Sequence, residues 1–196
     1  LLKDIATITI DTSGAGLHKR GYRQTAGQAP LKETLAAAMV DLSFWNPDRL
    51  LLDPMCGSGT IPIEAAMIGR NMAPGLKRQF VSEEWPFMPK ALWDKARQEA
   101  EDAIDRTVDF RILASDIDGR VLRTARHNAK QAGVEDFIAF QTLPLNEVSS
   151  KKKYGCIITN PPYGERLGEQ REVEELYEEM GRICKNLDTC SFYILT

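Results

Sequence analysis

The sequence predicts an α/β domain whose doubly wound, mostly parallel sheet carries helices on both faces. Short apolar segments of strand character alternate with amphipathic helical segments along most of the chain, an order typical of parallel sheets. The first of these segments, residues 50–52, ends in Asp53 and leads into a turn that contains Gly57 and Gly59. A strand, a glycine turn and a helix in succession are typical of a nucleotide-like ligand site at the carboxyl end of a parallel strand.

Two elements are expected before this central strand. Ile5, Ile8 and Ile10 follow a strand-like rhythm, and residues 11–14 have turn chemistry. Pro30 then opens a predicted helix, because a proline in the first turn loses no hydrogen bond. The residues at helical spacing, which we expect to pack on the core, are Leu31, Leu35, Ala38, Met39 and Leu42.

After the glycine turn, strand and helix segments alternate to the end of the chain. Apolar runs predict strands over residues 50–52, 110–114, 137–143, 154–159 and 191–196. Helical periodicity predicts helices over residues 60–68, 90–106 and 172–184. Another helix is expected between Asp118, a capping acid, and Gly133, a typical residue just past a helix end. Residues 71–89 are expected to form an ordered loop, so the first crossover carries an extra segment.

Composition limits the class of protein. The 196 residues with 43% hydrophobic content suit one soluble domain, and no apolar run approaches the roughly 20 residues of a membrane helix. The four cysteines lack close pairing and the histidines number two, which favours a reduced, cytoplasmic protein without a metal site. A net charge of −3 leaves the question of partners open, although residues 18–23 are locally basic.

The glycine turn predicts a particular ligand. Pro62 occupies the place of the third glycine of a dinucleotide fingerprint, so an NAD-dependent oxidoreductase is disfavoured. Asp53 would repel a pyrophosphate but would accept a hydrogen bond from an ammonium, and Asp116 follows the second strand, where it is placed to accept two ribose hydroxyls. A ligand with an ammonium and a ribose but no phosphate is S-adenosylmethionine. The predicted cofactor-binding residues are Asp53, Pro54, Cys56, Gly57, Ser58, Gly59, Thr60, Asp116 and Ile117.

The fourth strand ends in the tetrapeptide Asn160, Pro161, Pro162 and Tyr163, which we interpret as the catalytic segment. In a doubly wound sheet this strand lies beside the first, so the tetrapeptide faces the methyl end of the cofactor. The Asn160 side-chain oxygen and the Pro161 carbonyl would each accept one N–H of an exocyclic base amine and aim its lone pair at the methyl. Pro161 and Pro162 would hold those acceptors rigidly, and Tyr163 offers a face for stacking a flipped base.

Several motifs in the same order give the chain a family resemblance. They occupy residues 17–23, 29–35, 53–60, 73–76, 115–118 and 160–167. From about residue 11 onward the chain resembles the methyltransferase domain of THUMP-linked class I RNA methyltransferases, closest to bacterial guanine-N2 enzymes acting on 23S ribosomal RNA. The resemblance implies N2-methylguanosine as the product and an upstream THUMP domain that helps to hold RNA. It also implies that residues 1–16 are the tail of that upstream segment, and residues 17–196 a methyltransferase domain without its final strands.

One position departs from the family. Many relatives carry an acid after the third strand that holds the adenine of the cofactor, whereas this sequence has residues 141–144 without an acid, ending in Pro144. Backbone groups or Gln141 would then have to recognise the adenine.

The basic loop is expected either to touch RNA phosphates or to close over the cofactor. The predicted RNA-binding residues are Lys19, Arg20, Tyr22, Arg23 and Arg166.

Two alternatives stay open at this point. The same tetrapeptide would serve the N6 amine of adenine in a nucleic acid. A non-catalytic RNA-binding module of the same fold is a further possibility, although the combination of Asp53, Asp116 and Asn160 argues for catalysis.

Overall fold

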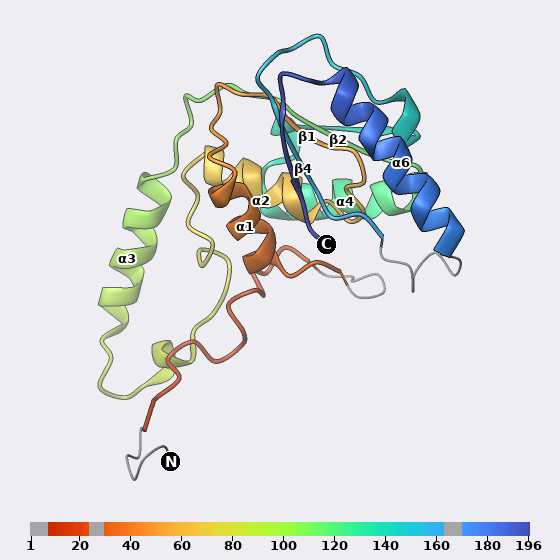
Figure 1. Cartoon of the computed structure of the whole chain (residues 1–196). Helices are drawn as coiled ribbons and strands as arrows, with labels where there is room; N and C mark the ends of the chain where they lie inside the picture. The colour runs from red at the N-terminus through yellow and green to blue at the C-terminus, as the bar shows by residue number, and fades with distance from the viewer. Residues whose placement is uncertain (1–7, 24–29, 163–169) are drawn as a thin grey trace.

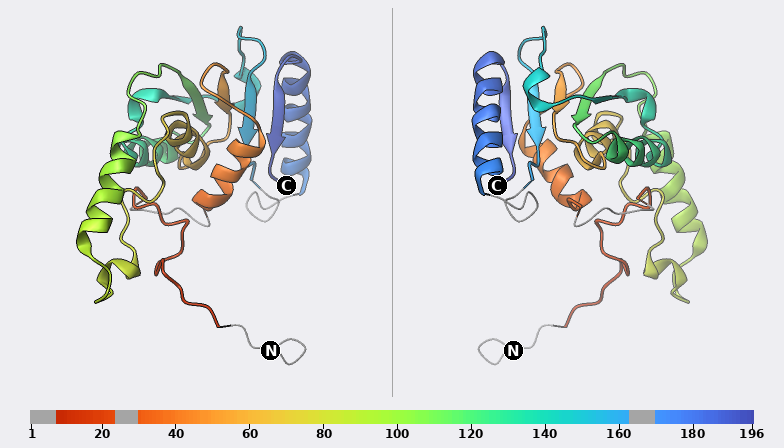
Figure 2. Two further views of the ribbon diagram at one scale, coloured as in Figure 1. Left: turned by 90° about the vertical axis from the view of Figure 1, so that its left-hand side faces the viewer. Right: turned by 90° about the vertical axis from the view of Figure 1, so that its right-hand side faces the viewer.

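The computed structural model describes residues 8–23, 30–162 and 170–196, and it confirms the predicted fold class. Five parallel strands form one sheet in the order β3-β2-β1-β4-β5, with helices on both faces (Figures 1 and 2). The strands are β1 Leu51–Asp53, β2 Ile112–Asp116, β3 Ile138–Thr142, β4 Cys156–Thr159 and β5 Ser191–Ile194. Because the order reverses direction at β1, the carboxyl ends of β1 and β4 flank a topological switch point, where open α/β sheets bind ligands.

The helices occupy the segments that the sequence predicts, with shifted ends. They are α1 Glu33–Leu42, α2 Thr60–Gly69, α3 Lys90–Asp102, α4 Gly119–Ala132 and α6 Gln170–Asn186. Three short 3-10 helices are η1 Val81–Glu84, η2 Glu135–Phe137 and η3 Leu145–Glu147. The predicted caps of α4 are confirmed: the Asp118 side chain accepts the backbone N–H of Arg120, and Gly133 ends the helix in the left-handed region.

The sheet separates two apolar cores because successive strand residues point to opposite faces. Leu51 and Ile158 face α1, α2 and α4, and they pack in the larger core. Leu52 and Ile157 face the other side, where α6 and η3 cover them. Strands buried on both faces explain why β1 and β4 read as continuous apolar runs rather than alternating ones.

The crossover from β1 to β2 projects from the body as an arm that includes α3 (Figure 1). The helix begins at Lys90 as expected but ends at Asp102 instead of Arg106, and none of its residues is fully buried. Its apolar side contacts the arm itself: Trp93 stacks on Phe80, with ring centroids 5.2 Å apart. The arm is thus ordered mainly by its own contacts.

The first helix differs from its prediction in two ways. It begins at Glu33 rather than at Pro30, and Lys32, its N-cap, is still extended. Its buried face consists of Glu33, Ala36 and Val40, whereas three of the expected core residues, Leu35, Ala38 and Leu42, are exposed. The other two, Leu31 and Met39, are partly buried against the core, so the periodicity identified the buried face only in part.

The N-terminal strand is a second correction. Ile5 lies outside the described residues, while Ile8 and Ile10 belong to no strand and are 91% and 76% exposed. Only the turn after them is confirmed, because the Asp11 carboxylate accepts the backbone N–H of Ser13 at 2.8 Å. Without a neighbouring strand among the described residues, the local rhythm does not lead to sheet pairing.

Candidate active site

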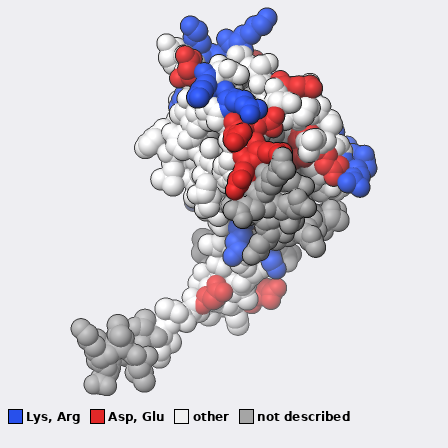
Figure 3. All heavy atoms as spheres, turned by 45° about the vertical axis from the view of Figure 1, so that its right-hand side comes forward, with Lys and Arg blue, Asp and Glu red and all other residues white. Residues whose placement is uncertain are grey.

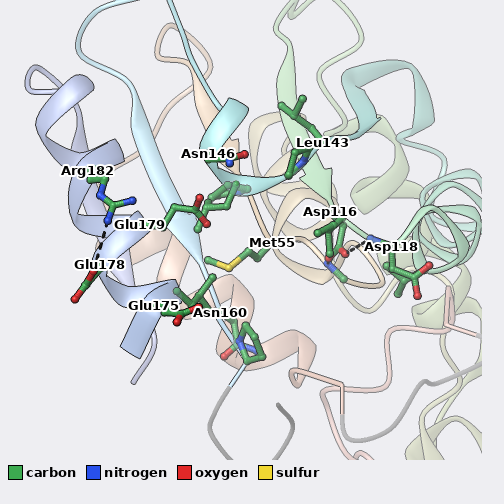
Figure 4. A pocket seen from close by; sticks show the side chains of 18 residues that line it. Met55, Asp116, Asp118, Leu143, Asn146, Asn160, Glu175, Glu178, Glu179 and Arg182 are labelled. Atoms are coloured by element: carbon green, nitrogen blue, oxygen red, sulfur yellow. Dashed lines mark hydrogen bonds and ion pairs between the residues drawn. The ribbon is translucent and has the colours of Figure 1, made fainter. Parts of the chain in front are cut away.

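A cavity of about 1110 Å³ opens at the carboxyl ends of β1, β2 and β4 (Figure 4). It lies at the switch point of the sheet, where the sequence predicts the ligand. The predicted site residues that line it are Pro54, Gly57, Asp116, Ile117, Asn160 and Pro162. The structure thus brings the glycine turn, the end of β2 and the end of β4 to one cavity.

The two glycines of the turn have different functions. Gly57 has φ of +52° on the cavity wall, and a Cβ at this position would meet no atom within 4 Å. It therefore leaves room for a ligand on this wall, and its contact with the cofactor stays a prediction. Gly59 has φ of +84°, caps α2 and lies against α4, where a Cβ would stand 3.1 Å from the Cβ of Ala125. Gly59 is required by helix packing rather than by approach to a ligand.

Asp53 is buried at the end of β1. Its Oδ1 accepts hydrogen bonds from the Thr159 hydroxyl at 2.8 Å and from the Met55 backbone N–H at 3.3 Å. Burial raises the pKa of Asp53 to about 7, since these two hydrogen bonds offset only part of the desolvation cost. Asp53 is not among the cavity-lining residues, so its contact with a ligand ammonium stays a prediction.

Asp116 lines the cavity from the end of β2 and organises the turn beside it. One carboxylate oxygen accepts the Gly57 backbone N–H and the other accepts the Asp118 backbone N–H, both at 2.9 Å. A carboxylate offers about four acceptor sites. Capacity therefore remains for the hydroxyls of a ribose, and the backbone bonds hold the carboxylate in place (Figure 4).

Several residues outside the cavity bind the glycine turn. The Cys56 backbone N–H donates to the Ser115 carbonyl at 2.9 Å, and the buried Asn128 amide donates to the Ser58 carbonyl at 3.1 Å. Thr60 begins α2 and accepts a hydrogen bond from the Arg23 guanidinium. Cys56, Ser58, Gly59 and Thr60 thus support the shape of the turn without lining the cavity. Burial also raises the pKa of the Cys56 thiol.

The basic loop turns inward. Arg20 pairs with Glu64 at 3.3 Å, and the Tyr22 hydroxyl donates to the same carboxylate at 3.1 Å. Arg23 approaches Glu33 at 3.5 Å. Burial, followed by the nearby Glu64 charge, raises the pKa of Tyr22 well above its ordinary range.

This geometry argues against RNA phosphate contacts for Arg20, Tyr22 and Arg23, whose polar ends bind the protein itself. Lys19 is exposed. Arg166 and Tyr163 lie outside the described residues.

The end of β4 presents one polar side chain to the cavity. Asn160 is half-buried and lines it, as does Pro162, whereas Pro161 is buried behind them. In Figure 4 the Asn160 side chain lies on the same side of the cavity as Met55, away from Asp116 and Asp118. The cavity therefore has a cofactor end at Asp116 and a second end at Asn160.

Sequence reasoning missed the rest of the wall. Leu143, Pro144, Leu145 and Asn146 contribute from the loop after β3. The side of α6 that faces the cavity contributes Glu175, Leu176, Glu178, Glu179 and Arg182. The sequence signal for this side is the spacing of residues 175, 179 and 182, which places them on one helical face. The loop after β3, which lines the same cavity, is distant in sequence, so the spacing alone does not reveal that the two segments meet.

Among the described residues, no group of three His, Cys, Asp or Glu side chains is arranged to hold a metal ion. Within the same part of the chain, no helix has the length and apolar character needed to span a membrane.

The fold and this site together define a Rossmann-like methyltransferase domain. The profile of a family described as "UPF0020: RMKL-like, methyltransferase domain" matches residues 20–195. The chain belongs to this family. This membership confirms the predicted methyltransferase class and, with it, the predicted cofactor, S-adenosylmethionine.

Named relatives agree with this assignment. The chain is 54% identical over 196 residues to "Putative RNA methyltransferase YpsC" of Bacillus subtilis (strain 168), covering 100% of this chain and 51% of that protein. It is 43% identical to "Ribosomal RNA large subunit methyltransferase K/L" of Legionella pneumophila (strain Corby), covering 97% of this chain and 27% of that protein. The chain therefore spans about half of the first relative and about a quarter of the second.

Solved structures show the same fold. A Listeria monocytogenes protein described as "a predicted N6-adenine-specific DNA methylase" has a TM-score of 0.90 and 54% identity, with coverage of 94% of this chain and 49% of that one. A structure described as "SMU.472, a putative methyltransferase complexed with SAH" has a TM-score of 0.88 and 46% identity, with coverage of 93% and 48%. These two structures confirm the predicted fold class.

Proposed function

We propose that this chain transfers a methyl group from S-adenosylmethionine to the exocyclic N2 amine of a guanine in RNA, with 23S ribosomal RNA as the substrate. The observation that carries the proposal is the shared cavity, which Gly57 and Asp116 line at one end and Asn160 lines at the other. The name of the Legionella relative, a large-subunit ribosomal RNA methyltransferase, supports the choice of RNA.

The residues at the Asp116 end of the cavity fit S-adenosylmethionine. Asp116 retains acceptor capacity for the ribose hydroxyls, Gly57 allows close approach of the backbone, and Ile117, which is 75% exposed, offers an apolar surface to the adenine ring. Asp53 is assigned to the ammonium of the methionine moiety. A bound cation would favour its ionised form and lower its raised pKa.

When bound, the cofactor supplies an electrophilic methyl on a sulfonium. In our proposal Asn160 Oδ1 and the Pro161 carbonyl accept the two N–H bonds of the guanine N2 amine and direct its lone pair toward that methyl. The N2–CH₃ bond forms as the S–CH₃ bond breaks, and N2 loses one proton to water. The acceptors also stabilise the positive charge that develops on N2, so no general base with a shifted pKa is needed.

Substrate capture beyond the cavity belongs to the same proposal. Of the basic loop, exposed Lys19 is assigned to RNA phosphates, while Arg20, Tyr22 and Arg23 support the turn. The roles of Tyr163 in base stacking and of Arg166 in RNA binding are retained as proposals from the sequence. An upstream THUMP domain, joined near residue 16, would supply further RNA affinity.

The test is methyl transfer by the full-length protein. Labelled S-adenosylmethionine and unmethylated 23S ribosomal RNA are incubated with the wild type and with Asn160→Ala, and the RNA nucleosides are analysed by mass spectrometry. We expect N2-methylguanosine from the wild type and a loss of at least 100-fold in rate for Asn160→Ala, the size typical of lost transition-state hydrogen bonds. Undiminished transfer by the variant would remove Asn160 from the mechanism.

An adenine-N6 methyltransferase is the second candidate. The Listeria structure is described as an N6-adenine-specific DNA methylase, and the same two acceptors fit the adenine N6 amine. The nucleoside analysis decides between the two, because N6-methyladenosine in place of N2-methylguanosine would assign the chain to adenine. A non-catalytic module would bind cofactor in calorimetry and yield neither product.

A further inference from the structure

The edge of the sheet opposite the cavity carries a surface that is both basic and aromatic. It is formed by the turn before β1 and the loop before β4, two strands that are neighbours in the sheet. We call it the amino-end surface, and its members are Phe44, Arg49, Lys151, Lys152, Lys153 and Tyr154. Figure 3 shows Lys and Arg side chains at the top of the molecule, the end at which the loop before β4 lies in Figure 1. None of the six residues lines the cavity, so the surface is separate from the candidate active site.

The two aromatic residues of this surface have strained backbones. Phe44 has φ of +52° and Tyr154 has φ of +60°, in the left-handed region that bulky side chains rarely adopt. Phe44 follows Ser43, the C-cap of α1, a position that glycine usually occupies. Phe44 and Tyr154 are 81% and 70% exposed, so core packing does not explain an aromatic ring at either position. The fold would be served as well by glycine, and the two rings therefore point to a ligand.

Arg49 joins the two segments of the surface. Its guanidinium donates to the Tyr154 carbonyl at 2.9 Å, to the Gly155 carbonyl at 3.3 Å and to the Ser191 hydroxyl at 3.0 Å. Its own carbonyl accepts the Trp45 indole N–H at 2.8 Å. These hydrogen bonds tie the turn before β1 to the backbone that carries the Tyr154 ring. A ring on a fixed backbone loses less conformational entropy when it binds a partner.

The lysines give the surface its charge. All three residues of the segment 151–153 are exposed, and among the described residues none of them forms an ion pair. The printed partners of the Arg49 guanidinium are neutral oxygens. Exposed acids in the adjoining turns are Asp48 and Asp188, which leaves the surface net positive within a chain of net charge −3. Such a surface is suited to an anionic partner.

We infer that the amino-end surface binds RNA, with the lysines on phosphates and the rings of Phe44 and Tyr154 stacked on unpaired bases. The inference rests on the proposed function, in which RNA is the anionic substrate. Lysines beside exposed aromatic rings are the combination that holds single-stranded nucleic acid without reading its sequence.

This surface and the cavity lie at opposite ends of the same strands. β4 has four residues and spans about 13 Å at about 3.3 Å per residue. One RNA molecule therefore reaches both places only if it extends well beyond the target nucleotide, as 23S ribosomal RNA does. The surface would contribute to affinity for the large RNA and leave the chemical step unchanged.

The first test is the salt dependence of RNA binding by the full-length protein. Labelled 23S ribosomal RNA is titrated at several salt concentrations with the wild type and with Lys151→Met/Lys152→Met/Lys153→Met. The slope of log K against log[salt] should become shallower by about 2 in the variant, since each lost phosphate contact to a single strand removes about 0.7. Calorimetry with S-adenosylmethionine should give the wild-type affinity, because the cavity is not altered.

The matched control is Lys90→Met/Lys95→Met/Lys130→Met. It removes the same charge from exposed positions on α3 and α4, and it should keep the wild-type slope. An equal loss of slope in both triple variants would reflect total charge rather than this surface, and would overturn the inference.

The second test separates stacking from a structural role. Tyr154→Gly and Phe44→Gly relieve the positive φ, so urea unfolding should show stability no lower than that of the wild type. RNA affinity should nevertheless fall at least about 5-fold in each, the lower end of the effect of losing one stacked base. Phe87→Ser, which changes a 75% exposed aromatic residue on the arm, should keep the wild-type affinity.

The outcomes distinguish this inference from the proposed function. Unchanged salt slope and unchanged affinity in the surface variants, with N2-methylguanosine formed by the wild type, would overturn the amino-end surface and leave the proposed function intact. The expected losses of slope and affinity in a protein that forms no N2-methylguanosine would support the surface and contradict the proposed reaction. A loss of stability in Tyr154→Gly with wild-type RNA affinity would make the residue structural and would overturn its stacking role.

Discussion

At the scale of single residues, the site depends on polar groups held in apolar surroundings. Asp53 is fully buried at a strand end, and among the described residues two hydrogen-bond donors reach its carboxylate. Burial also raises the pKa of Glu64, although its Arg20 and Tyr22 partners oppose this shift. Such groups make the site sensitive to pH and to the loss of any partner, because an uncompensated buried charge is costly.

Asp53 should make the free protein less stable as the pH rises. Its pKa is about 7 in the fold against 3.8 ordinarily, so between these values the folded state holds a proton that the unfolded chain has lost. Stability therefore falls from about pH 4 to pH 7 and is level above, by an amount on the order of 4 kcal/mol at about 1.36 kcal/mol per pKa unit. Asp53→Asn should remove this dependence and be more stable than the wild type at pH 8.

The measurement is urea unfolding without cofactor at pH 5 and pH 8. Asp118→Asn serves as the control. Hydrogen bonds from Arg120 lower the pKa of the exposed Asp118, so this substitution should not increase the free energy of unfolding at pH 8. A wild type that becomes more stable toward pH 8, relative to Asp53→Asn, would show that Asp53 ionises in the fold without penalty.

Arg23 should act on stability rather than on RNA affinity. Its replacement by Met leaves the buried Glu33 without its ion-pair partner and Thr60 without its donor, a change expected to cost about 3–5 kcal/mol. The double variant Arg23→Met/Glu33→Gln should recover most of that loss. Thermal and urea unfolding measure the effect, with exposed Lys19→Met as a control that changes stability by less than about 0.5 kcal/mol. Equal stabilities for Arg23→Met and Lys19→Met would contradict a structural role for Arg23.

At the scale of elements, the glycine turn joins β1, α2, α4 and the end of β2. Cys56 bonds to Ser115, Gly57 to Asp116, and Ser58 to Asn128. The turn thus receives its shape from three partners that are distant in sequence. A change in any one of these elements is transmitted to the cavity through the backbone of the turn.

The two glycines of the turn should respond differently to alanine. Gly59→Ala meets both a left-handed backbone and the Ala125 Cβ at 3.1 Å, so it should destabilise the fold by roughly 1–3 kcal/mol. Gly57→Ala has open space around its Cβ and should cost about 1 kcal/mol, but its methyl enters the cavity and should weaken S-adenosylmethionine binding at least 10-fold. Urea unfolding and calorimetry on both variants test the pair. If Gly57→Ala lost more stability and Gly59→Ala lost more affinity for S-adenosylmethionine, the functions assigned to the two glycines would be contradicted.

At the scale of the whole molecule, a sheet packed on both faces contrasts with a weakly anchored arm. The β1 and β4 residues are buried throughout, whereas α3 contains no buried residue. The arm contacts the N-terminal segment through Arg78, which donates to the Ser13 and Gly16 carbonyls. Regions with few buried apolar contacts open at low free energy, so local stability should differ strongly between the two.

Amide hydrogen exchange should reveal this difference. We expect α3 amides to exchange at least 100-fold faster than those of β1 and β4, since opening α3 exposes little apolar surface. Mass spectrometry of peptides from residues 90–102 and from residues 50–53 makes the comparison. Equal protection of the two regions would indicate that the arm packs on the body more firmly than its burial implies.

The sequence by itself determined the alternation of elements, because parallel strands buried on both faces appear as short apolar runs between amphipathic helices. It located the glycine turn, Asp116 and Asn160, since special backbone conformations and strand-end polar residues leave local signals. Local signals failed where burial depends on distant neighbours: Leu35 and Leu42 of α1 are exposed, and Arg20 and Arg23 turn inward to Glu64 and Glu33.

Only the tertiary structure decided which face of α1 meets the core and which face of α6 closes the cavity. It also brought Asn146, Asn160 and Glu179 to the wall of one cavity, although the loop after β3, the end of β4 and α6 are separate in sequence. The physical reason is that periodicity fixes the spacing of side chains along an element, whereas their neighbours are fixed by how the elements pack.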